Sequence, residues 1–217
     1  IKEIKERIHI PLVADIHFNP KAAEVAASIV SKVRINPGNY TDRNRGKIDY
    51  TEKEYNAEIE KIKERLKPLI EICKVHNTAI RIGTNHGSLS ERVVSRYGNT
   101  PYAMAVSAFE FAKICHSLGF DNLILSQKSS NVKVMVSSTR MLCEMLDKEG
   151  LNYPIHLGVT EAGDGQDGRI KSAVGIGGML AIGIGDTIRV SLTEKPENEI
   201  LIAKDILQAS GDRIYKA

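Results

Sequence analysis

The sequence of 217 residues has no tryptophan, only four phenylalanines and only three cysteines. It contains no apolar run near the roughly 20 residues that a membrane-spanning helix needs, and we expect none of these residues to be a secretory signal peptide. Its net charge is only +3, and no basic run is interleaved with aromatic residues. We therefore expect neither a membrane nor a nucleic acid as a partner. Because the chain begins at Ile1 without a methionine, we also expect a segment upstream.

The three cysteines, Cys73, Cys115 and Cys143, are far apart and include no C-x-x-C spacing. Each lies in a helical pattern among apolar neighbours, where a free cysteine behaves as a small hydrophobic residue. We therefore predict that all three pack in the core, which fits a reducing compartment such as a cytosol.

Apolar β-branched runs alternate with helical patterns along the chain. With 42% hydrophobic residues, one domain is expected. The predicted strands are 12–18, 32–37, 78–85, 122–128, 155–161 and 187–192, and the predicted helices are 1–10, 21–31, 51–76, a short one within 86–99, 100–119, 131–149, 169–180 and 197–209.

Most of these strands are near-continuous apolar runs, which is typical of a parallel sheet covered by helices. The best candidate is an α/β fold, a (β/α)8 TIM barrel of which six βα units are visible. We expect that residues 1–217 form a partial barrel domain whose first two units are missing at the N-terminus. A doubly wound open sheet is the alternative, but no G-x-G-x-x-G follows the first strand.

Local signals mark several helix ends. Asn19-Pro20 and Thr100-Pro101 are typical helix starts, and Thr51 with Glu54 has the spacing of a capping box. Pro68 is expected to kink or divide its helix. Residues 39–57, which carry Arg43, Arg45 and Lys47, read as a long surface loop.

An arginine inside an apolar run, followed by a small polar residue, occurs in three of the predicted strands. The runs are Val33-Arg34-Ile35-Asn36, Ile80-Arg81-Ile82-Gly83-Thr84-Asn85 and Ile188-Arg189-Val190-Ser191. Since side chains in a strand alternate with a period of two, each arginine shares a face with the polar residue that follows it. A single such arginine is most simply explained by solvation, but three in similar form predict one anionic site.

In a barrel the carboxyl ends of the strands form the active site. The residues predicted there are Asp15 and His17, Arg34 and Asn36, Arg81 and Asn85, Ser126 and Lys128, Thr160 and Glu161, and Arg189 and Ser191. Four cations in one partly buried mouth repel one another, whereas arginine matches phosphate oxygens well. The sequence therefore predicts a small substrate with more than one phosphate, and Glu161 as a proton donor to it.

Some of these residues have other interpretations. His17 is equally consistent with a structural histidine, and Lys128 with a Schiff-base lysine of an aldolase-type barrel. Asp186 is interpreted as a turn or capping residue and His156 as structural. The Asp164–Gly168 loop lacks the full EF-hand spacing, so we expect no metal there.

The runs ADIHF (14–18), VRINPGN (33–39), RIGTNHGSLSER (81–92), GVTEAG (158–163) and GDTIRVSL (185–192) resemble the barrel domain of the 4-hydroxy-3-methylbut-2-enyl diphosphate synthase family. The resemblance covers nearly the whole chain in order. The stretch from DGRIKSAVGIG to SLTEKPENEI looks most like the three-domain form found in plants and some bacteria.

The resemblance implies an oxidoreductase of the methylerythritol phosphate route to isoprenoids. Its substrate would be 2-C-methyl-D-erythritol 2,4-cyclodiphosphate, reduced with electrons from ferredoxin or flavodoxin. By motif match, the diphosphate would be held by Arg34, Arg81, Lys128, Arg189 and Ser191, the pocket lined by His17, Asn36 and Asn85, and the proton given by Glu161. The compartment would be a bacterial cytoplasm or a plastid stroma.

The resemblance also implies a [4Fe–4S] cluster, which in the family belongs to a separate C-terminal domain. None of the three cysteines here falls in a cluster motif, so we expect no metal ligand in this chain and no turnover by it alone. Two other hypotheses remain open at this point. One is a pterin-using transferase barrel related to dihydropteroate synthase, and the other is a non-catalytic phosphate-binding module.

Overall fold

The computed structural model describes residues 1–41 and 49–211. Its strands are β1 (Val13–Asp15), β2 (Lys32–Ile35), β3 (Ala79–Asn85), β4 (Leu123–Lys128), β5 (His156–Leu157) and β6 (Thr187–Ile188). Its helices are α1 (Lys2–Arg7), α2 (Pro20–Ala27), α3 (Pro37–Tyr40), α4 (Glu52–His76), η1 (His86–Ser88), α5 (Glu91–Tyr97), α6 (Pro101–Ser117), α7 (Val132–Lys148), α8 (Gly165–Ser172), η2 (Ala173–Gly177), α9 (Gly178–Ala181) and α10 (Pro196–Ala209). The predicted loop residues Arg43, Arg45 and Lys47 lie outside the described residues.

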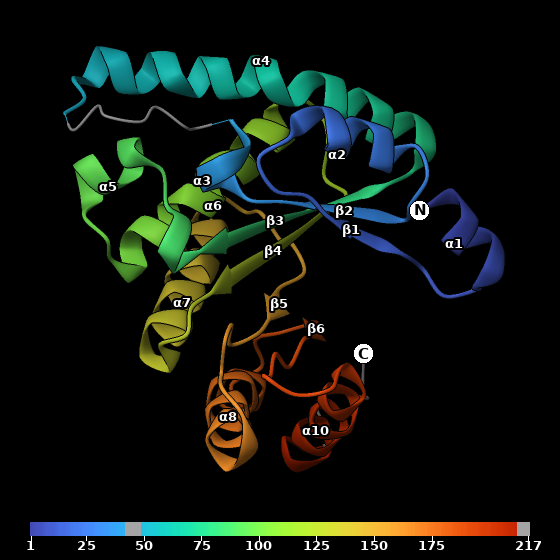
Figure 1. The fold of residues 1–217 in the computed structure, drawn as a ribbon. Helices are drawn as coiled ribbons and strands as arrows, with labels where there is room; N and C mark the ends of the chain where they lie inside the picture. Colours follow the sequence, from blue (N-terminus) through green and yellow to red (C-terminus); the bar gives the residue numbers. More distant parts are fainter. Residues whose placement is uncertain (42–48, 212–217) are drawn as a thin grey trace.

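All six strands run parallel and follow one another in chain order (Figure 1). β1 to β4 form one sheet, β5 and β6 form another, and a parallel bridge between Leu125 and Ile155 joins the two. A doubly wound sheet reverses its strand order at one point, and this order does not reverse. The predicted alternative is therefore wrong, and the arrangement is that of a partial (β/α)8 barrel.

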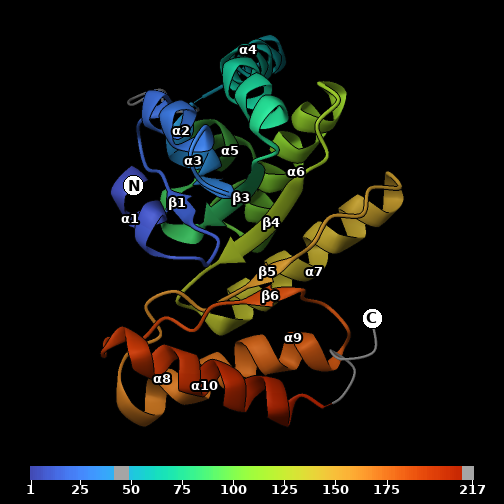
Figure 2. The same ribbon diagram turned by 90° about the vertical axis from the view of Figure 1, so that its right-hand side faces the viewer.

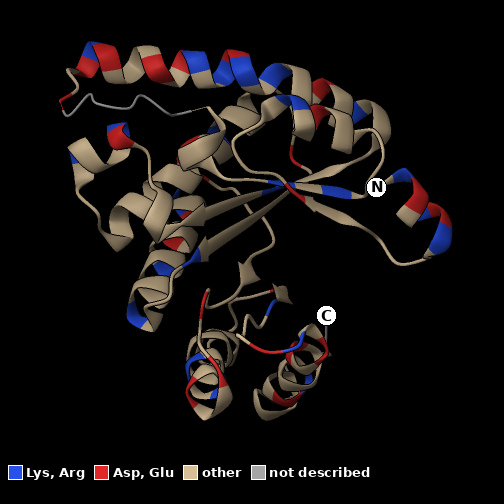
Figure 3. Cartoon of the chain, viewed as in Figure 1, with Lys and Arg blue, Asp and Glu red and all other residues tan. Residues whose placement is uncertain are grey.

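The two faces of the strands differ in chemistry, and helices wrap the outer one (Figure 2). Val33, Ile35, Ile80 and Ile82 are completely buried against those helices. Burying one such side chain stabilises the fold by about 1.5–3 kcal/mol. The six strands lie side by side in an arc. The alternate positions of the same strands point to the inner side of this arc, and charged residues lie at some of these positions (Figure 3).

Every strand is shorter than predicted, and β1, β5 and β6 differ most from the prediction. β1 ends at Asp15, and β5 and β6 contain two residues each. His17, Glu161, Arg189 and Ser191 therefore lie on the loops that follow strands. Figures 1 and 2 show β5 and β6 as short arrows below the four-stranded sheet.

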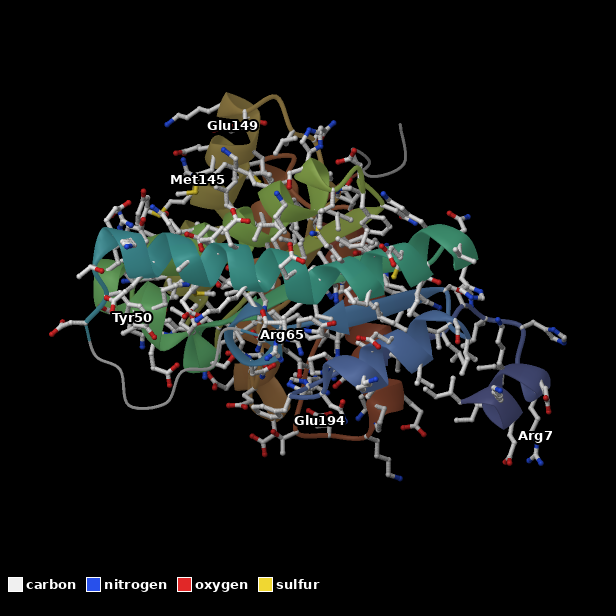
Figure 4. The ribbon with its side chains drawn as sticks, turned by 90° about the horizontal axis from the view of Figure 1, so that it is seen from above. Arg7, Tyr50, Arg65, Met145, Glu149 and Glu194 are labelled. Carbon is white, nitrogen blue, oxygen red and sulfur yellow. The ribbon has the colours of Figure 1, made fainter. Side chains whose placement is uncertain are left out.

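The predicted helix ends are largely confirmed. Asn19, Thr51 and Thr100 each accept a hydrogen bond from the first turn, and Thr51 forms the full capping box with Glu54. Pro68 does not divide α4, which runs as one helix of 25 residues. Charged residues follow α4 along its length (Figure 3), and Arg65, labelled in Figure 4, lines a cavity together with Phe18 and Tyr40.

Two helical features were not predicted. The short helix α3 follows β2 directly, across the end of the predicted strand 32–37 and the start of the predicted loop 39–57. The predicted helix 169–180 begins earlier, at Gly165, and passes through the π-helical segment Ala173–Gly177 before α9. At Gly175 a Cβ atom would lie 2.6 Å from Val159, so this segment packs closely on the strand end. No helix among the described residues is long and apolar enough to cross a bilayer.

Candidate anion site at the strand ends

A cavity of about 150 Å³ opens where the strands end. It is lined by Asp15, His17, Arg34, Arg81, Asn85, Ser126, Lys128, Thr160 and Arg189. The register explains the meeting of the first cations, because Asp15 pairs with Arg34 and Arg34 pairs with Arg81 across three neighbouring strands. Four cations therefore face one carboxylate in this cavity.

Arg34 is held by three neighbours. One guanidinium nitrogen donates to Asp15 Oδ1 at 2.8 Å and lies 2.9 Å from His17 Nε2, and the other donates to the carbonyl of Gly83 at 2.8 Å. His17 Nε2 also lies 3.3 Å from Asp15 Oδ1, so the three side chains form one connected group. Arg34 is 6% exposed, so its partners replace the water it has lost.

The pKa of Asp15 reflects the same contact. Burial opposes its ionisation, but the hydrogen bond and charge of Arg34 outweigh burial, with help from His17 and Arg81. The pKa of Asp15 therefore lies below its ordinary value, and the carboxylate is charged. The sequence placed Asp15 at a strand end but assigned it no role in the site.

Two glycines make room for the cations. A Cβ atom at Gly83 would lie 2.4 Å from Arg34 Nε, and one at Gly158 would lie 3.3 Å from Lys128 Cε and 2.9 Å from the carbonyl of Arg189. Any larger residue would displace Arg34 or Lys128. The glycines therefore let long cationic side chains cross the inner face of neighbouring strands.

Arg81 and Lys128 differ from Arg34, because neither makes a hydrogen bond or an ion pair with another described residue. Arg81 is 9% exposed, and its Nε is buried without a partner. The pKa of Arg81 is lowered to about 10, mainly by burial and then by the charges of Arg34 and Arg189. The pKa of Lys128 is lowered to about 7, mainly by burial and then by the charges of Arg81 and Arg189. Buried cations without partners are costly, and a bound anion would relieve that cost.

His156 belongs to this interior as well, although it was interpreted as structural. Its Nδ1 lies 2.8 Å from Thr187 Oγ1, and its Nε2 is buried without a partner. Burial, then the charges of Arg81 and Lys128, lowers the pKa of His156 to about 2, so the ring is neutral. The period of two that places His156 on the face of Gly158 and Thr160 is the sequence signal that would have found it.

The two predicted asparagines have local partners. Asn36 is 2% exposed, caps α3 by accepting from the amide of Gly38, and donates to Ser88 Oγ at 2.7 Å. It does not line the cavity, so the structure gives it the role of joining two loops. Asn85 lines the cavity while capping η1 through the amide of Gly87.

The last three predicted residues lie on loops. Arg189 lines the cavity, is about half exposed, and has Nε 3.8 Å from Glu199 Oε2. Glu161 is exposed, with a φ of 49°, and neither it nor Ser191 lines the cavity. The amide of Ala162 donates to the carbonyl of Ser191 at 3.2 Å, so the two loops are neighbours.

The described residues do not fit an iron–sulfur cluster. Cys73 and Cys115 are fully buried, and burial raises the pKa of both thiols to about 12, whereas cluster ligands are thiolates. Cys143 is partly buried, and burial raises its pKa to about 11. No group of three His, Cys, Asp or Glu in the described ranges is placed to hold a metal ion.

A larger cavity, of about 560 Å³, lies on the outer helices between α4 and α6. Its wall includes Tyr55, whose hydroxyl donates to Glu110, and the buried Arg92 pairs with the same carboxylate at 2.8 Å. The charge of Arg92 is thus already balanced by Glu110. The cavity at the strand ends, with its unpartnered cations, is therefore the better candidate site.

Comparison with known proteins gives one consistent result. Residues 1–204 match the family of the GcpE TIM-barrel domain. The chain is 58% identical over 205 residues to a 4-hydroxy-3-methylbut-2-en-1-yl diphosphate synthase (flavodoxin) of Parabacteroides distasonis, covering 94% of this chain and 34% of that protein. It is 53% identical over 205 residues to the chloroplastic ferredoxin form of Arabidopsis thaliana, covering 91% of this chain and 28% of that protein. The chain thus spans about a third of the length of these relatives.

Proposed function

Because the chain belongs to the GcpE family, we propose that it is the substrate-binding barrel of a 4-hydroxy-3-methylbut-2-enyl diphosphate synthase. Its substrate would be 2-C-methyl-D-erythritol 2,4-cyclodiphosphate. In the reaction of the whole enzyme, the substrate takes up two electrons and two protons. One ring C–O bond breaks, and a hydroxyl leaves as water. The product is the linear hydroxymethylbutenyl diphosphate.

The observation that carries this proposal is the pair of unpartnered cations, Arg81 and Lys128, beside Arg189 in one cavity. A cyclic diphosphate brings two negative groups on one small ring, which matches several cations better than a single phosphate does. Arg34 lies beside them, and its guanidinium group is already hydrogen-bonded to Asp15. We propose that it forms a fixed wall of the pocket while Arg81, Lys128 and Arg189 close on the anion.

We propose Glu161 as the proton donor, with Ser191, His17 and Asn85 as further members of the site and Asn36 as the residue that holds the neighbouring loops together. Glu161 lies on the loop between β5 and α8, at the carboxyl ends of the strands. Its Gln variant should bind the cyclodiphosphate and fail to turn it over in the assembled enzyme. Lost binding would instead place Glu161 among the groups that hold the substrate.

The electrons of this reaction have to come from outside the described residues, which offer no cluster ligands. We propose that a [4Fe–4S] domain, in the same or a partner chain, receives them from ferredoxin or flavodoxin, the donors named for the relatives. We also propose that further βα units close the arc between β6 and β1. The compartment would be a bacterial cytoplasm or a plastid stroma.

Calorimetric titration of the chain tests the substrate. The cyclodiphosphate should bind, a pterin diphosphate should not, and Arg81→Gln should weaken binding by about 1.5–3 kcal/mol, the scale of a lost charge-assisted hydrogen bond. Arg140→Gln, on the exposed side of α7, is the matched control and should change nothing. Tighter binding of the pterin, or equal loss in both variants, would reject the proposal.

Lys128 also allows one other chemistry. A lysine with a pKa near 7 is suited to Schiff-base formation, as in an aldolase-type barrel. The neighbouring guanidinium groups of Arg81 and Arg189 favour the anion, because a carbonyl substrate needs no such charge. If the anion interpretation is right, the cyclodiphosphate should protect Lys128 from reductive alkylation by an aldehyde and borohydride, whereas the exposed Lys133 should be alkylated with or without it.

A further inference from the structure

The loops after β5 and β6 are held together by a side-chain contact outside the cavity. Arg169 of α8 donates both guanidinium nitrogens to Glu194, at 2.5 and 2.9 Å, in a two-pronged ion pair. Glu194 also accepts from the amide of Gly165 at 2.9 Å and from Asn198 Nδ2 at 2.9 Å. We call Arg169 and Glu194 the clasp; Figure 4 labels Glu194.

The backbone continues the contact between the same two loops. The amide of Thr193 donates to the carbonyl of Gly163 at 2.9 Å, next to the bond between Ala162 and Ser191. The first turn of α8 packs tightly there as well, because a Cβ atom at Gly168 would lie 2.7 Å from the Gly163 carbonyl oxygen. Residues 162–169 and 191–198 therefore form one connected patch.

This connection matters because the sheet does not provide it. β5 and β6 pair through only two residues each, at His156–Leu157 and Thr187–Ile188. Beyond them, the first loop carries Thr160 and Glu161, and the second carries Arg189 and Ser191. Without long strands to align them, the relative position of these groups depends on contacts between the loops.

We propose that Arg169 and Glu194 are positioning residues, whose clasp fixes the loop of Glu161 against the loop of Arg189 and so keeps the anion site in shape. This inference rests on the proposed function, since it takes a diphosphate as the ligand. The hydrogen bond and charge of Arg169, with the hydrogen bond from Asn198, lower the pKa of Glu194 to about 2. The clasp is accordingly closed across the physiological pH range.

The test compares Glu194→Gln and Arg169→Met with the control Lys171→Met. Lys171 makes an ion pair of 2.6 Å with Asp167 on the same helix, α8, but joins no second loop. Two readouts are taken on the full chain, namely hydrogen exchange at the amides of Ala162 and Thr193 and the affinity for the cyclodiphosphate. Breaking the clasp should speed that exchange and weaken binding about tenfold, because a displaced Arg189 makes a poorer charge-assisted hydrogen bond to the anion. The control should change neither.

The double variant separates a shared role from two independent ones. If the pair acts as one device, Arg169→Met with Glu194→Gln together should weaken binding no more than either alone. Additive losses, unchanged exchange in the single variants, or faster exchange with full affinity would each overturn the proposal. If the unaltered chain binds no cyclodiphosphate, the proposed function fails, and the exchange readout still reports on the clasp.

Discussion

Replacing Lys128 by methionine should stabilise the folded chain while weakening its site. The ammonium group is buried beside Arg81 and Arg189 and has no partner, so folding forces it into an unfavourable place. Methionine keeps a similar length without the charge. We therefore expect Lys128→Met to raise the free energy of unfolding, and to raise it more at low pH than at high pH.

The magnitude follows from the change in the pKa of Lys128 from 10.5 in the unfolded chain to about 7 in the folded one. Below pH 7 Lys128 is protonated in both the folded and the unfolded state. Burying its charge then lowers the free energy of unfolding by about 5 kcal/mol. Between pH 7 and 10.5 only the unfolded state holds the proton, so stability rises with pH as the folded lysine stays neutral. At pH 9 the remaining cost is about 2 kcal/mol. The gain from Lys128→Met should thus be about 3 kcal/mol larger at pH 6 than at pH 9.

Urea unfolding of both proteins at pH 6 and pH 9 measures this difference directly. Other titrating groups are common to both proteins and cancel in the comparison. The control Lys171→Met removes an exposed lysine from α8 and should change the free energy of unfolding by about 0.5 kcal/mol or less at both pH values. An equal gain in unfolding free energy at pH 6 and pH 9, or a loss of stability, would refute the argument that the buried charge of Lys128 destabilises the chain without its ligand.

Three further outcomes follow from the site and the core. Gly83→Ala should cost about 1–3 kcal/mol of unfolding free energy, because its new Cβ meets Arg34 Nε at 2.4 Å; urea unfolding that matches the unaltered chain would show that Arg34 moves freely. Arg189→Ala should weaken calorimetric binding of the cyclodiphosphate by about 1.5–3 kcal/mol, and unchanged affinity would remove Arg189 from the pocket. Cys73 and Cys115, fully buried with pKa values near 12, should resist iodoacetamide at pH 8 in the folded chain and react after unfolding; rapid reaction in the folded state would contradict the burial.

Local features of the fold were readable from the sequence. The caps at Asn19, Thr51 and Thr100 depend on residues within one turn, and each is present. The alternation that places Arg34 and Arg81 on the inner face depends only on strand geometry, and the parallel register brings the two together. The meeting of these cations in one cavity was therefore predictable before any family was considered.

What escaped prediction depends on partners distant in the sequence. The lengths of β5 and β6 are set by pairing with neighbours rather than by their own apolar runs. Asn36 has the spacing of a pocket residue, yet its amide is used by Gly38 and Ser88, the latter 52 residues away. His156 was interpreted as structural because it starts a strand, and the charges that surround it come from Arg81 and Lys128, on strands far away in the sequence.

The π-helical segment Ala173–Gly177 should make its helix tolerant of a one-residue change in length. A π turn holds one residue more than an α-helix does over the same stretch, and the residues on its two sides, Ser172 and Met179, are both fully buried. Deleting one residue within 173–177 would return the segment to a regular α-helix with both flanks still facing inward. The same deletion in α10 would rotate the following residues by about 100° and turn the buried Ile206 away from the core. Evolutionary insertions and deletions should therefore collect in the first of these helices and be purged from the second.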